Sequence, residues 1–241
     1  MRSSNDSPHI LSEFLAQDTR LGRMAATRVL LIHGAATTAA IWSGVTGLLP
    51  GLEVVAPQRA YSGDLAVELA ALAGPAEGAV VVGVSGGATL GLALVAAGVP
   101  VAGAVLHEPA VGSLVPGLLT HVADAYTAHG VPGFGSALYG PAWDPSMAPA
   151  DEAAVGRDFA MFRAFQPTPP TPTRPPTPSG PSGPVLTTVG ALSPPARFAA
   201  ARALLEFAGL PYLALDGCGH AVHLERPEAL AAVVREVAAA G

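Results

Sequence analysis

The feature that most constrains the fold of this sequence is a repeat in which short apolar runs alternate with alanine-rich stretches of helical length. Runs of about four to eight β-branched and leucine residues between glycines and prolines are typical of buried strands. Such strand segments, several of which run on into a loop, lie at 27–35, 52–63, 78–87, 101–109, 183–191 and 211–220.

Helices are predicted between these strands, at 37–49, 64–74, 88–98, 195–209 and 226–241. Asp64 is a suitable N-cap for the second helix and Gly74 a suitable end, and Thr37 or Thr38 is the expected cap of the first. Strands that alternate with helices pair in parallel, because each helix carries the chain back across the sheet. The sequence therefore predicts an α/β fold with a doubly wound, mostly parallel sheet.

One long stretch interrupts the repeat. Residues 111–166 hold weak helical patches and many of the larger side chains, and residues 167–182 are rich in proline, threonine and serine. Proline at this density excludes regular helix and central strand, which favours a stiff extended connector. We therefore expect a core at 27–110 and 183–241, a helical lid inserted between two late strands, and a flexible N-terminal tail at 1–26.

Charge and cysteine content limit the partners. The formal net charge of −6, with no basic cluster to offset it, argues against nucleic acid. The uncharged stretch 79–106 is long enough to cross a membrane, but glycines divide it into strand, helix and strand. A single cysteine, Cys218, excludes an intrachain disulfide. The first residues lack the apolar core of a signal peptide, so we expect a cytoplasmic protein without membrane attachment.

Ser85 is the candidate nucleophile. The pentapeptide GVSGG, residues 83–87, matches G-x-S-x-G and stands between an apolar strand and an Ala/Leu helix. A strand-to-helix elbow holds its serine in a strained, exposed turn, and the flanking glycines relieve the crowding there. A phosphate-binding loop is the alternative, but neither G-x-x-x-x-G-K-[ST] nor a supporting G-x-G-x-x-G is present. The context therefore favours a nucleophile elbow.

His220 is the candidate base, since a serine hydroxyl is a poor nucleophile until a base takes its proton. It follows the last strand and precedes the terminal helix, in the segment GCGHAVHLERPEAL. An ordinary loop histidine is the other interpretation of this residue. His223 competes for the role of base, but we expect it to lie on the following turn and to pack against its neighbours.

Three motifs in this order, LLIHGA, GVSGG and GCGHAVHLERPEAL, resemble those of the α/β-hydrolase superfamily across the predicted core. The resemblance implies a catalytic Ser85–His220 pair. It also implies an oxyanion hole formed by the backbone N–H of Gly86 and of Gly34 or Ala35, which stabilises the negative oxygen of a tetrahedral intermediate.

The third catalytic residue departs from the superfamily pattern. Most members carry an aspartate after the next-to-last strand, but here that strand ends in TTVGALSPP, with Ser193 near the expected place. Serine supplies no negative charge to stabilise an imidazolium. Either the triad is broken or its acid comes from elsewhere in the chain.

Glu108 is the candidate for this acid. Glu108 stands at the end of the strand that follows the elbow helix. In a parallel sheet this strand is the neighbour of the nucleophile strand, so the Glu108 carboxylate is expected near His220. Some α/β-hydrolases take their acid from this position, and the motifs VVGVSGGAT, LHEPA and TVGALSP resemble those of zearalenone-lactonase-like hydrolases. The alternatives are that Glu108 is merely the first solvated loop residue, or that Asp216 is the acid. If the strand continues through both residues, His107 points to the opposite face from Glu108, and we expect it to be structural.

Together these residues predict a serine hydrolase that cleaves an ester or lactone of a small, mostly apolar substrate through an acyl-enzyme, with no cofactor and no metal. The lid residues that line the pocket or form the lid's own core are Tyr139, Trp143, Met161 and Phe162. The same Ser/His pair could serve C–C bond hydrolysis. A non-catalytic ligand-binding protein on the same fold, its triad lost at Ser193, is the rival interpretation, and a homodimer is left open.

Overall fold

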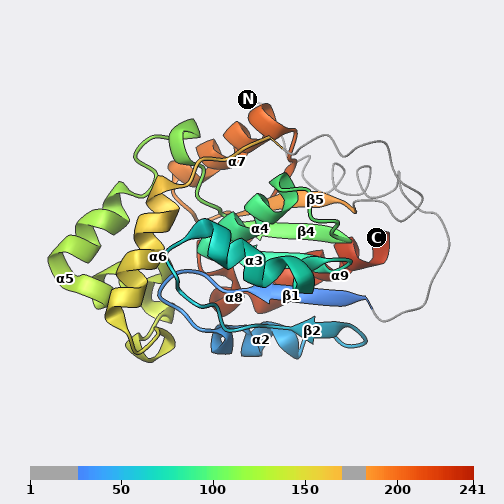
Figure 1. Ribbon diagram of the computed structural model, residues 1–241, viewed down its shortest axis with the longest axis horizontal. Coiled ribbons are helices and arrows are strands. Elements are labelled where there is room, and N and C mark those ends of the chain that lie inside the picture. The colour runs from blue at the N-terminus through green and yellow to red at the C-terminus, as the bar shows by residue number, and fades with distance from the viewer. Residues whose placement is uncertain (1–26, 170–182) are drawn as a thin grey trace.

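The computed structural model describes residues 27–169 and 183–241, so the predicted tail and residues 170–182 of the predicted connector lie outside the described residues. Its strands form a six-stranded sheet in the order β2-β1-β3-β4-β5-β6, in which every neighbouring pair is parallel (Figure 1). The strands are β1 (Arg28–Ile32), β2 (Glu53–Val55), β3 (Val80–Val84), β4 (Gly103–His107), β5 (Val185–Gly190) and β6 (Tyr212–Leu215). The predicted parallel, doubly wound sheet is confirmed.

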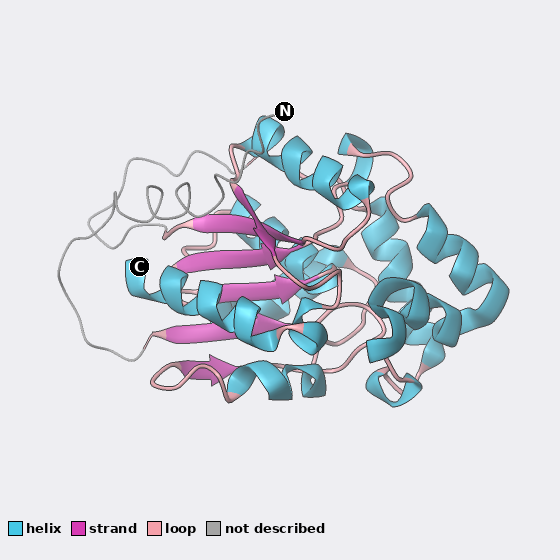
Figure 2. Cartoon of the chain, turned by 180° about the vertical axis from the view of Figure 1, so that it is seen from behind, coloured by secondary structure: helices cyan, strands magenta, loops and turns pink. Residues whose placement is uncertain are grey.

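Helices cover both faces of the sheet (Figures 1 and 2). One face packs against α3 (Leu65–Ala76), α4 (Gly86–Ala96) and α7 (Pro195–Ala208), and the other against α2 (Ser43–Thr46), α8 (Val222–Glu225) and α9 (Pro227–Ala240). Successive residues of β1 alternate between these two cores: Leu30 faces the first and Leu31 the second. Because both faces are covered, the central strands are apolar throughout, which is why they appear in the sequence as continuous runs.

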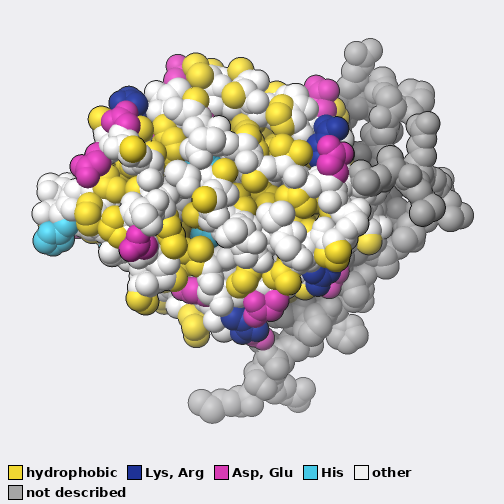
Figure 3. Space-filling view, turned by 90° about the horizontal axis from the view of Figure 1, so that it is seen from below, with side chains coloured by type: hydrophobic (Ala, Val, Ile, Leu, Met, Phe, Trp, Pro, Cys, Tyr) yellow, Lys and Arg dark blue, Asp and Glu magenta, His cyan; other side chains and the backbone are white. Residues whose placement is uncertain are grey.

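The uncharged stretch 79–106 is divided among β3, α4 and β4. Among the residues that the structure describes, none of the helices combines the length and the apolar character needed to cross a bilayer. On the face of the molecule shown in Figure 3, basic and acidic side chains stand in small mixed groups between hydrophobic ones, so the described part of this face carries no continuous basic patch.

Two predicted helices differ from the observed ones. The predicted helix at 37–49 is instead a 3₁₀ turn, η2 (Ala39–Trp42), followed by the single turn of α2, and the side chain of Thr38 caps neither. Asp64 does cap α3, by accepting hydrogen bonds from the N–H groups of Ala66 and Val67. The helix continues past Gly74 because a single glycine costs only about 1 kcal/mol when its neighbours pack.

The described part of the segment after β4, up to residue 169, is largely helical. It contains η3 (Gly112–Leu114), α5 (Thr120–Tyr139), η4 (Gly140–Ala142), η5 (Pro145–Met147) and α6 (Glu152–Ala164). Helix α5 is kinked at Gly130, where φ is +60°. Helices α5 and α6 lie beyond the carboxyl ends of the strands (Figures 1 and 2). We call residues 112–164 the α5–α6 segment.

Helix α4 packs closely against the end of β1 at Gly87, and substitution of this glycine tests how much that packing contributes to stability. A Cβ added at Gly87 would overlap the carbonyl of Ile32, whereas one added at Gly47, whose φ is −65°, meets no atom within 4 Å. We therefore expect Gly87→Ala to lower the free energy of unfolding by about 3 kcal/mol or more, through overpacking. Gly47→Ala is the matched control and should raise it by about 0.4–1 kcal/mol. Urea unfolding measures both, and equal midpoints would contradict the close packing at Gly87.

Candidate active site

Ser85 occupies a sharp turn between the end of β3 and the start of α4. Its backbone has φ +57° and ψ −120°, a conformation that non-glycine residues rarely adopt. A Cβ at Gly83 would overlap the backbone of Gly87, so glycine is needed for the strand and the helix to approach so closely. The geometry is that of the predicted elbow, with the serine at its apex.

His220 and Glu108 form a short hydrogen bond at the carboxyl edge of the sheet. His220 lies in the loop between β6 and α8, and its Nδ1 is 2.6 Å from Oε2 of Glu108. Glu108 directly follows β4 and is 4% exposed, with a backbone φ of +49°. It is therefore a buried partner of the histidine and not a solvated loop residue. Asp216, the other candidate acid, is exposed.

Three further groups bind the Glu108 carboxylate. Oε1 accepts hydrogen bonds from the Ser193 hydroxyl (2.5 Å) and from the N–H of Gly190 (2.9 Å), and the Nε of Arg197 lies 3.4 Å from Oε2. Burial opposes ionisation of the carboxyl, but the hydrogen bond from His220 and the nearby cationic groups outweigh it and hold the pKa of Glu108 well below its ordinary value. Ser193 thus stands beside the acid and donates to it.

The buried His220 ring is held in its neutral form. Burial is the main cause that lowers the pKa of His220 to about 4, the positive charge of Arg197 adds to it, and Glu108 acts in the opposite direction. Because Nδ1–H donates to Glu108, the neutral ring carries its lone pair on Nε2. This buried Nε2 has no hydrogen-bond partner among the described residues. The nitrogen that a base needs is therefore free to accept a proton.

Tyr139 links the histidine to the elbow. Its ring stacks on that of His220, with 5.6 Å between centroids and 29° between planes. Its hydroxyl donates to the carbonyl of Ala35 at 2.8 Å and also faces the Ser85 side chain. The Gly34 backbone lies against Ser85 as well, since an added Cβ there would be 3.2 Å from the serine Cβ. The loop after β1, which holds two of the predicted oxyanion donors, thus touches the elbow.

The histidine neighbours of His220 have structural positions. His107 is buried, its Nδ1 lies 2.9 Å from the Thr188 hydroxyl, and its Nε2 lies 3.2 Å from the carbonyl of Gly219. Strand β4 ends at His107, so the opposite-face arrangement expected of a continuous strand is not formed, and Nε2 of His107 lies 3.8 Å from Oε1 of Glu108. His223 lies on α8, buried and edge-on to Tyr139, in agreement with the expected packing role.

The remaining predicted pocket residues make different kinds of contact. Phe162 of α6 covers Gly86, whose added Cβ would overlap the phenyl ring. Trp143 donates its indole N–H to the carbonyl of Ala36 at 2.9 Å. Met161 is buried in the larger hydrophobic core. Cys218 is buried too, and burial raises the pKa of its thiol to about 11, which disfavours the reactive thiolate.

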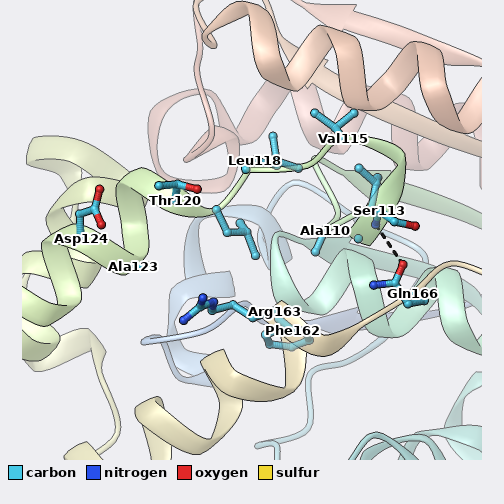
Figure 4. A pocket seen from close by; sticks show the side chains of 14 residues that line it. Ala110, Ser113, Val115, Leu118, Thr120, Ala123, Asp124, Phe162, Arg163 and Gln166 are labelled. Atoms are coloured by element: carbon cyan, nitrogen blue, oxygen red, sulfur yellow. Dashed lines mark hydrogen bonds between the residues drawn. The ribbon is translucent and has the colours of Figure 1, made fainter.

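Two cavities meet at Phe162. The inner chamber, of about 20 Å³, is bounded by Ser85, Gly86 and Glu108 on one side and by apolar side chains of α5 and α6 on the other. That volume holds about one water molecule. An outer pocket of about 410 Å³ (Figure 4) opens beside it. Both cavities share Ala110, Leu119 and Phe162 as walls.

The sequence analysis missed two buried arginines. Arg197 stands in the first turn of α7, where a cation opposes the helix dipole, and it lies beside Glu108. That unfavourable position was the available signal. Arg59, in the loop after β2, forms ion pairs with Glu68 and Asp158, and no local pattern marks it. Within the described ranges, no cluster of three His, Cys, Asp or Glu side chains is arranged to hold a metal ion.

Comparisons with known proteins agree with this architecture. Residues 29–233 match the profile of the alpha/beta hydrolase family. The carboxylesterase CesB (YbfK) of Bacillus subtilis has a similar structure, with a TM-score of 0.61 and 17% identity over 98% of this chain and 99% of that one. No curated protein matches the sequence.

Two other solved structures show the chemical range of such neighbours. The enol-lactonase of Burkholderia xenovorans LB400 has a TM-score of 0.63 and 18% identity, over 90% of this chain and 93% of that one. An epoxide hydrolase from metagenomes of hot environments has a TM-score of 0.59 and 16% identity, over 90% and 92%. These likenesses show the fold alone, whereas the family profile spans most of the chain. The protein is therefore a member of the α/β-hydrolase family.

Proposed function

We propose that this protein is a serine hydrolase that cleaves an ester or lactone of a small, mostly apolar substrate through an acyl-enzyme. The observation that carries the proposal is the buried Glu108–His220 hydrogen bond, which leaves Nε2 of His220 without a hydrogen-bond partner among the described residues. Tyr139 stacks on the His220 ring, and its hydroxyl faces the side chain of Ser85 at the strained turn. A charged acid, an oriented neutral base and a serine held at an elbow are the parts of a nucleophilic triad.

In this proposal, Nε2 of His220 takes the proton of the Ser85 hydroxyl while Oγ bonds to the substrate carbonyl carbon. The oxygen of that carbonyl becomes negative and is stabilised by the N–H of Gly86 and of Gly34 or Ala35. His220 then passes its proton to the leaving alcohol as the C–O bond breaks. In the second half, His220 deprotonates a water that attacks the acyl carbon, and Ser85 regains its proton. Glu108 stays ionised and stabilises the imidazolium.

The cavities support an apolar acyl group. The wall of the inner chamber opposite the triad consists of Leu119, Val122, Phe134, Leu138 and Phe159. A chamber with room for one water cannot hold a substrate, so entry requires α6 or its side chains to move toward the outer pocket. The resemblance to zearalenone-lactonase-like hydrolases rests on short motifs and on the position of Glu108, and it favours lactones among the candidate substrates.

The contacts of Glu108 and the identity of the elbow residue disfavour two of the alternative functions. The non-catalytic reading depended on a missing acid at Ser193, but Glu108 contacts His220 and Ser193 donates to Glu108. Epoxide hydrolase chemistry uses an aspartate nucleophile, and the elbow residue here is Ser85. C–C bond hydrolysis by the same residues stays an alternative, to be separated by the products formed.

Fluorophosphonate labelling tests the triad. We expect the wild type to be labelled, Ser85→Ala to lose labelling completely, and Glu108→Ala to react at least about a hundredfold more slowly, because the charge that stabilises the imidazolium is gone. The Ser193 hydroxyl stands 2.5 Å from the Glu108 carboxylate, so Ser193→Asp added to Glu108→Ala should restore part of the rate. Equal rates in wild type and Glu108→Ala would contradict the acid role, and a folded wild type without labelling would contradict the proposed function.

The pH profile tests the state of the base. Because the pKa of His220 is lowered to about 4, protonation of this base should lower kcat/KM about tenfold per pH unit below about pH 4. Arg197→Met should move this inflection to higher pH, since it removes a positive charge that disfavours the imidazolium. Arg202→Met, exposed on the same helix, is the control.

Folding must be followed at each pH in this experiment, by circular dichroism. Buried His33, His220 and His223 all have lowered pKa values, so the unfolded chain binds more protons and stability falls as the pH drops below about 6.5. A loss of rate that coincides with unfolding would be discarded. In the folded protein, an inflection near pH 6.5 that Arg197→Met moves to higher pH would contradict the lowered pKa of His220.

Phe162 separates the two cavities, so its removal should change substrate size preference. We expect Phe162→Ala to raise the kcat/KM of long-chain p-nitrophenyl esters relative to the acetate by about tenfold or more, because the chamber then opens into the outer pocket. Phe165→Ala removes an equally buried ring that lines neither cavity, and it is the control. An unchanged preference in Phe162→Ala would contradict this assignment.

A further inference from the structure

Arg59 carries a fully buried positive charge close to the elbow. It follows β2, and its guanidinium is 0% exposed. Its Nε lies 3.4 Å from Oε2 of Glu68 on α3, and its Nη1 and Nη2 each face one carboxylate oxygen of Asp158 on α6. Buried ion pairs of this kind are weak evidence for stability, because desolvation offsets much of their attraction. Their presence therefore calls for another explanation.

One nitrogen of this guanidinium also binds the loop after β1. Nη1 of Arg59 donates to the carbonyl of His33 at 3.3 Å and to that of Gly34 at 3.4 Å, and it lies 3.3 Å from Oδ2 of Asp158. The peptide group is planar and trans, so its N–H points away from its C=O. Holding the carbonyls of His33 and Gly34 on the Arg59 side therefore turns the N–H groups of Gly34 and Ala35 the other way.

The two peptide groups held by Arg59 are those that carry the candidate oxyanion donors. Five consecutive carbonyls of this loop, from His33 to Thr37, accept a side-chain hydrogen bond. The donors to the last three are Tyr139, Trp143 and Tyr61. Side chains, and not a strand ladder, thus orient the loop. Arg59 binds its first two carbonyls, and the Gly34 carbonyl also lies 3.0 Å from the Thr37 hydroxyl, 3.1 Å from Nδ1 of His33 and 3.4 Å from the Tyr61 hydroxyl.

Helix α6 connects this loop to the cover of the elbow. Asp158 and Phe162 are four residues apart, so they share one face of the helix. The guanidinium of Arg59 stands 5.4 Å from the centroid of the Phe162 ring and 4.9 Å from that of Tyr61. Phe162 in turn covers Gly86, the third candidate donor. When α6 packs in this position, Asp158 pairs with Arg59 and the Phe162 ring covers Gly86 at the same time.

We propose that Arg59 is a positioning residue for the oxyanion hole, and that the Asp158 carboxylate of α6 holds it in place only when the α5–α6 segment is closed. The inference rests on the proposed serine hydrolase function. Closure of α6 and alignment of the Gly34 and Ala35 N–H groups are then a single event, so the hole is complete only in the closed, water-poor chamber. Substrate can bind an open form without being turned over there.

The test is Asp158→Asn, with Asp151→Asn as its matched control. In Asp158→Asn an amide NH₂ must face a guanidinium N–H, so the two-point grip on Arg59 is lost while Glu68 still balances its charge. Asp151 is on the same helix and also pairs with an arginine, Arg157, but this pair is exposed and far more weakly coupled to the fold. Asp151 is also the N-cap of α6, and asparagine at this position preserves the cap.

The measurements are kcat and KM for p-nitrophenyl butyrate, the fluorophosphonate labelling rate, and the thermal midpoint. We expect Asp158→Asn to lower kcat and the labelling rate at least about tenfold and to change KM less than about threefold, because transition-state stabilisation is lost and ground-state binding is not. Asp151→Asn should stay within about twofold of wild type. A purely structural ion pair predicts a lower thermal midpoint with unchanged kcat in the folded protein.

Each outcome decides the proposal. Equal kcat in folded Asp158→Asn and Asp151→Asn overturns the role of Arg59 while leaving the serine hydrolase intact. A wild type that neither hydrolyses nor is labelled overturns the proposed function and this inference with it. If Asp158→Asn does not fold, Arg59→Lys decides instead: it keeps the charge opposite Asp158 but cannot span both carbonyls and the carboxylate. A kcat in Arg59→Lys equal to wild type overturns the inference, and a tenfold loss supports it.

Discussion

The hydrogen bonds of the Glu108 carboxylate are the interaction on which the candidate site depends, because they join segments that are distant in the sequence. The carboxylate accepts hydrogen bonds from His220, Ser193 and Gly190, and Arg197 lies beside it. A buried carboxylate is tolerated only when such donors replace its water. The end of β4, the end of β5, the start of α7 and the loop before α8 are therefore held around one anion. Loss of that anion would leave several donors unpaired at once, not only the histidine.

Around this anion, the functional backbone is irregular and close-packed. Ser85 and Glu108 both have positive φ values, and each directly follows a strand that ends at the same edge of the sheet. The loop from His33 to Thr37 makes its hydrogen bonds to side chains instead of to a neighbouring strand. Strain and unusual pairing of this kind are sustained because the surrounding parallel sheet is rigid and fully covered. The sheet thus supplies the stability that the site itself lacks.

The α5–α6 segment belongs to the site as well as covering it. Tyr139 and Trp143 bind carbonyls of the loop after β1, Asp158 binds Arg59, and Phe162 covers Gly86. Such contacts explain why the chamber around Ser85 has room for only about one water. In the proposed reaction, the closed segment excludes solvent from the place where negative charge develops, and low water content strengthens electrostatic stabilisation there. The same contacts must be broken for a substrate to enter in this proposal. Entry to the chamber is therefore coupled to the alignment of the Gly34 and Ala35 N–H groups.

The sequence by itself determined the parallel sheet and the positions of Ser85 and Glu108. Alternating strands and helices imply a shared carboxyl edge, and both residues stand where a strand ends. Short-range patterns did not reveal that the 37–49 segment forms only short turns, nor did they reveal the turn between His107 and Glu108. The partners of Arg59 and Arg197 were decided by the tertiary structure alone. A buried charge is defined by the groups that the sheet order brings around it, and these lie up to 99 residues away along the chain, beyond the reach of any local periodicity.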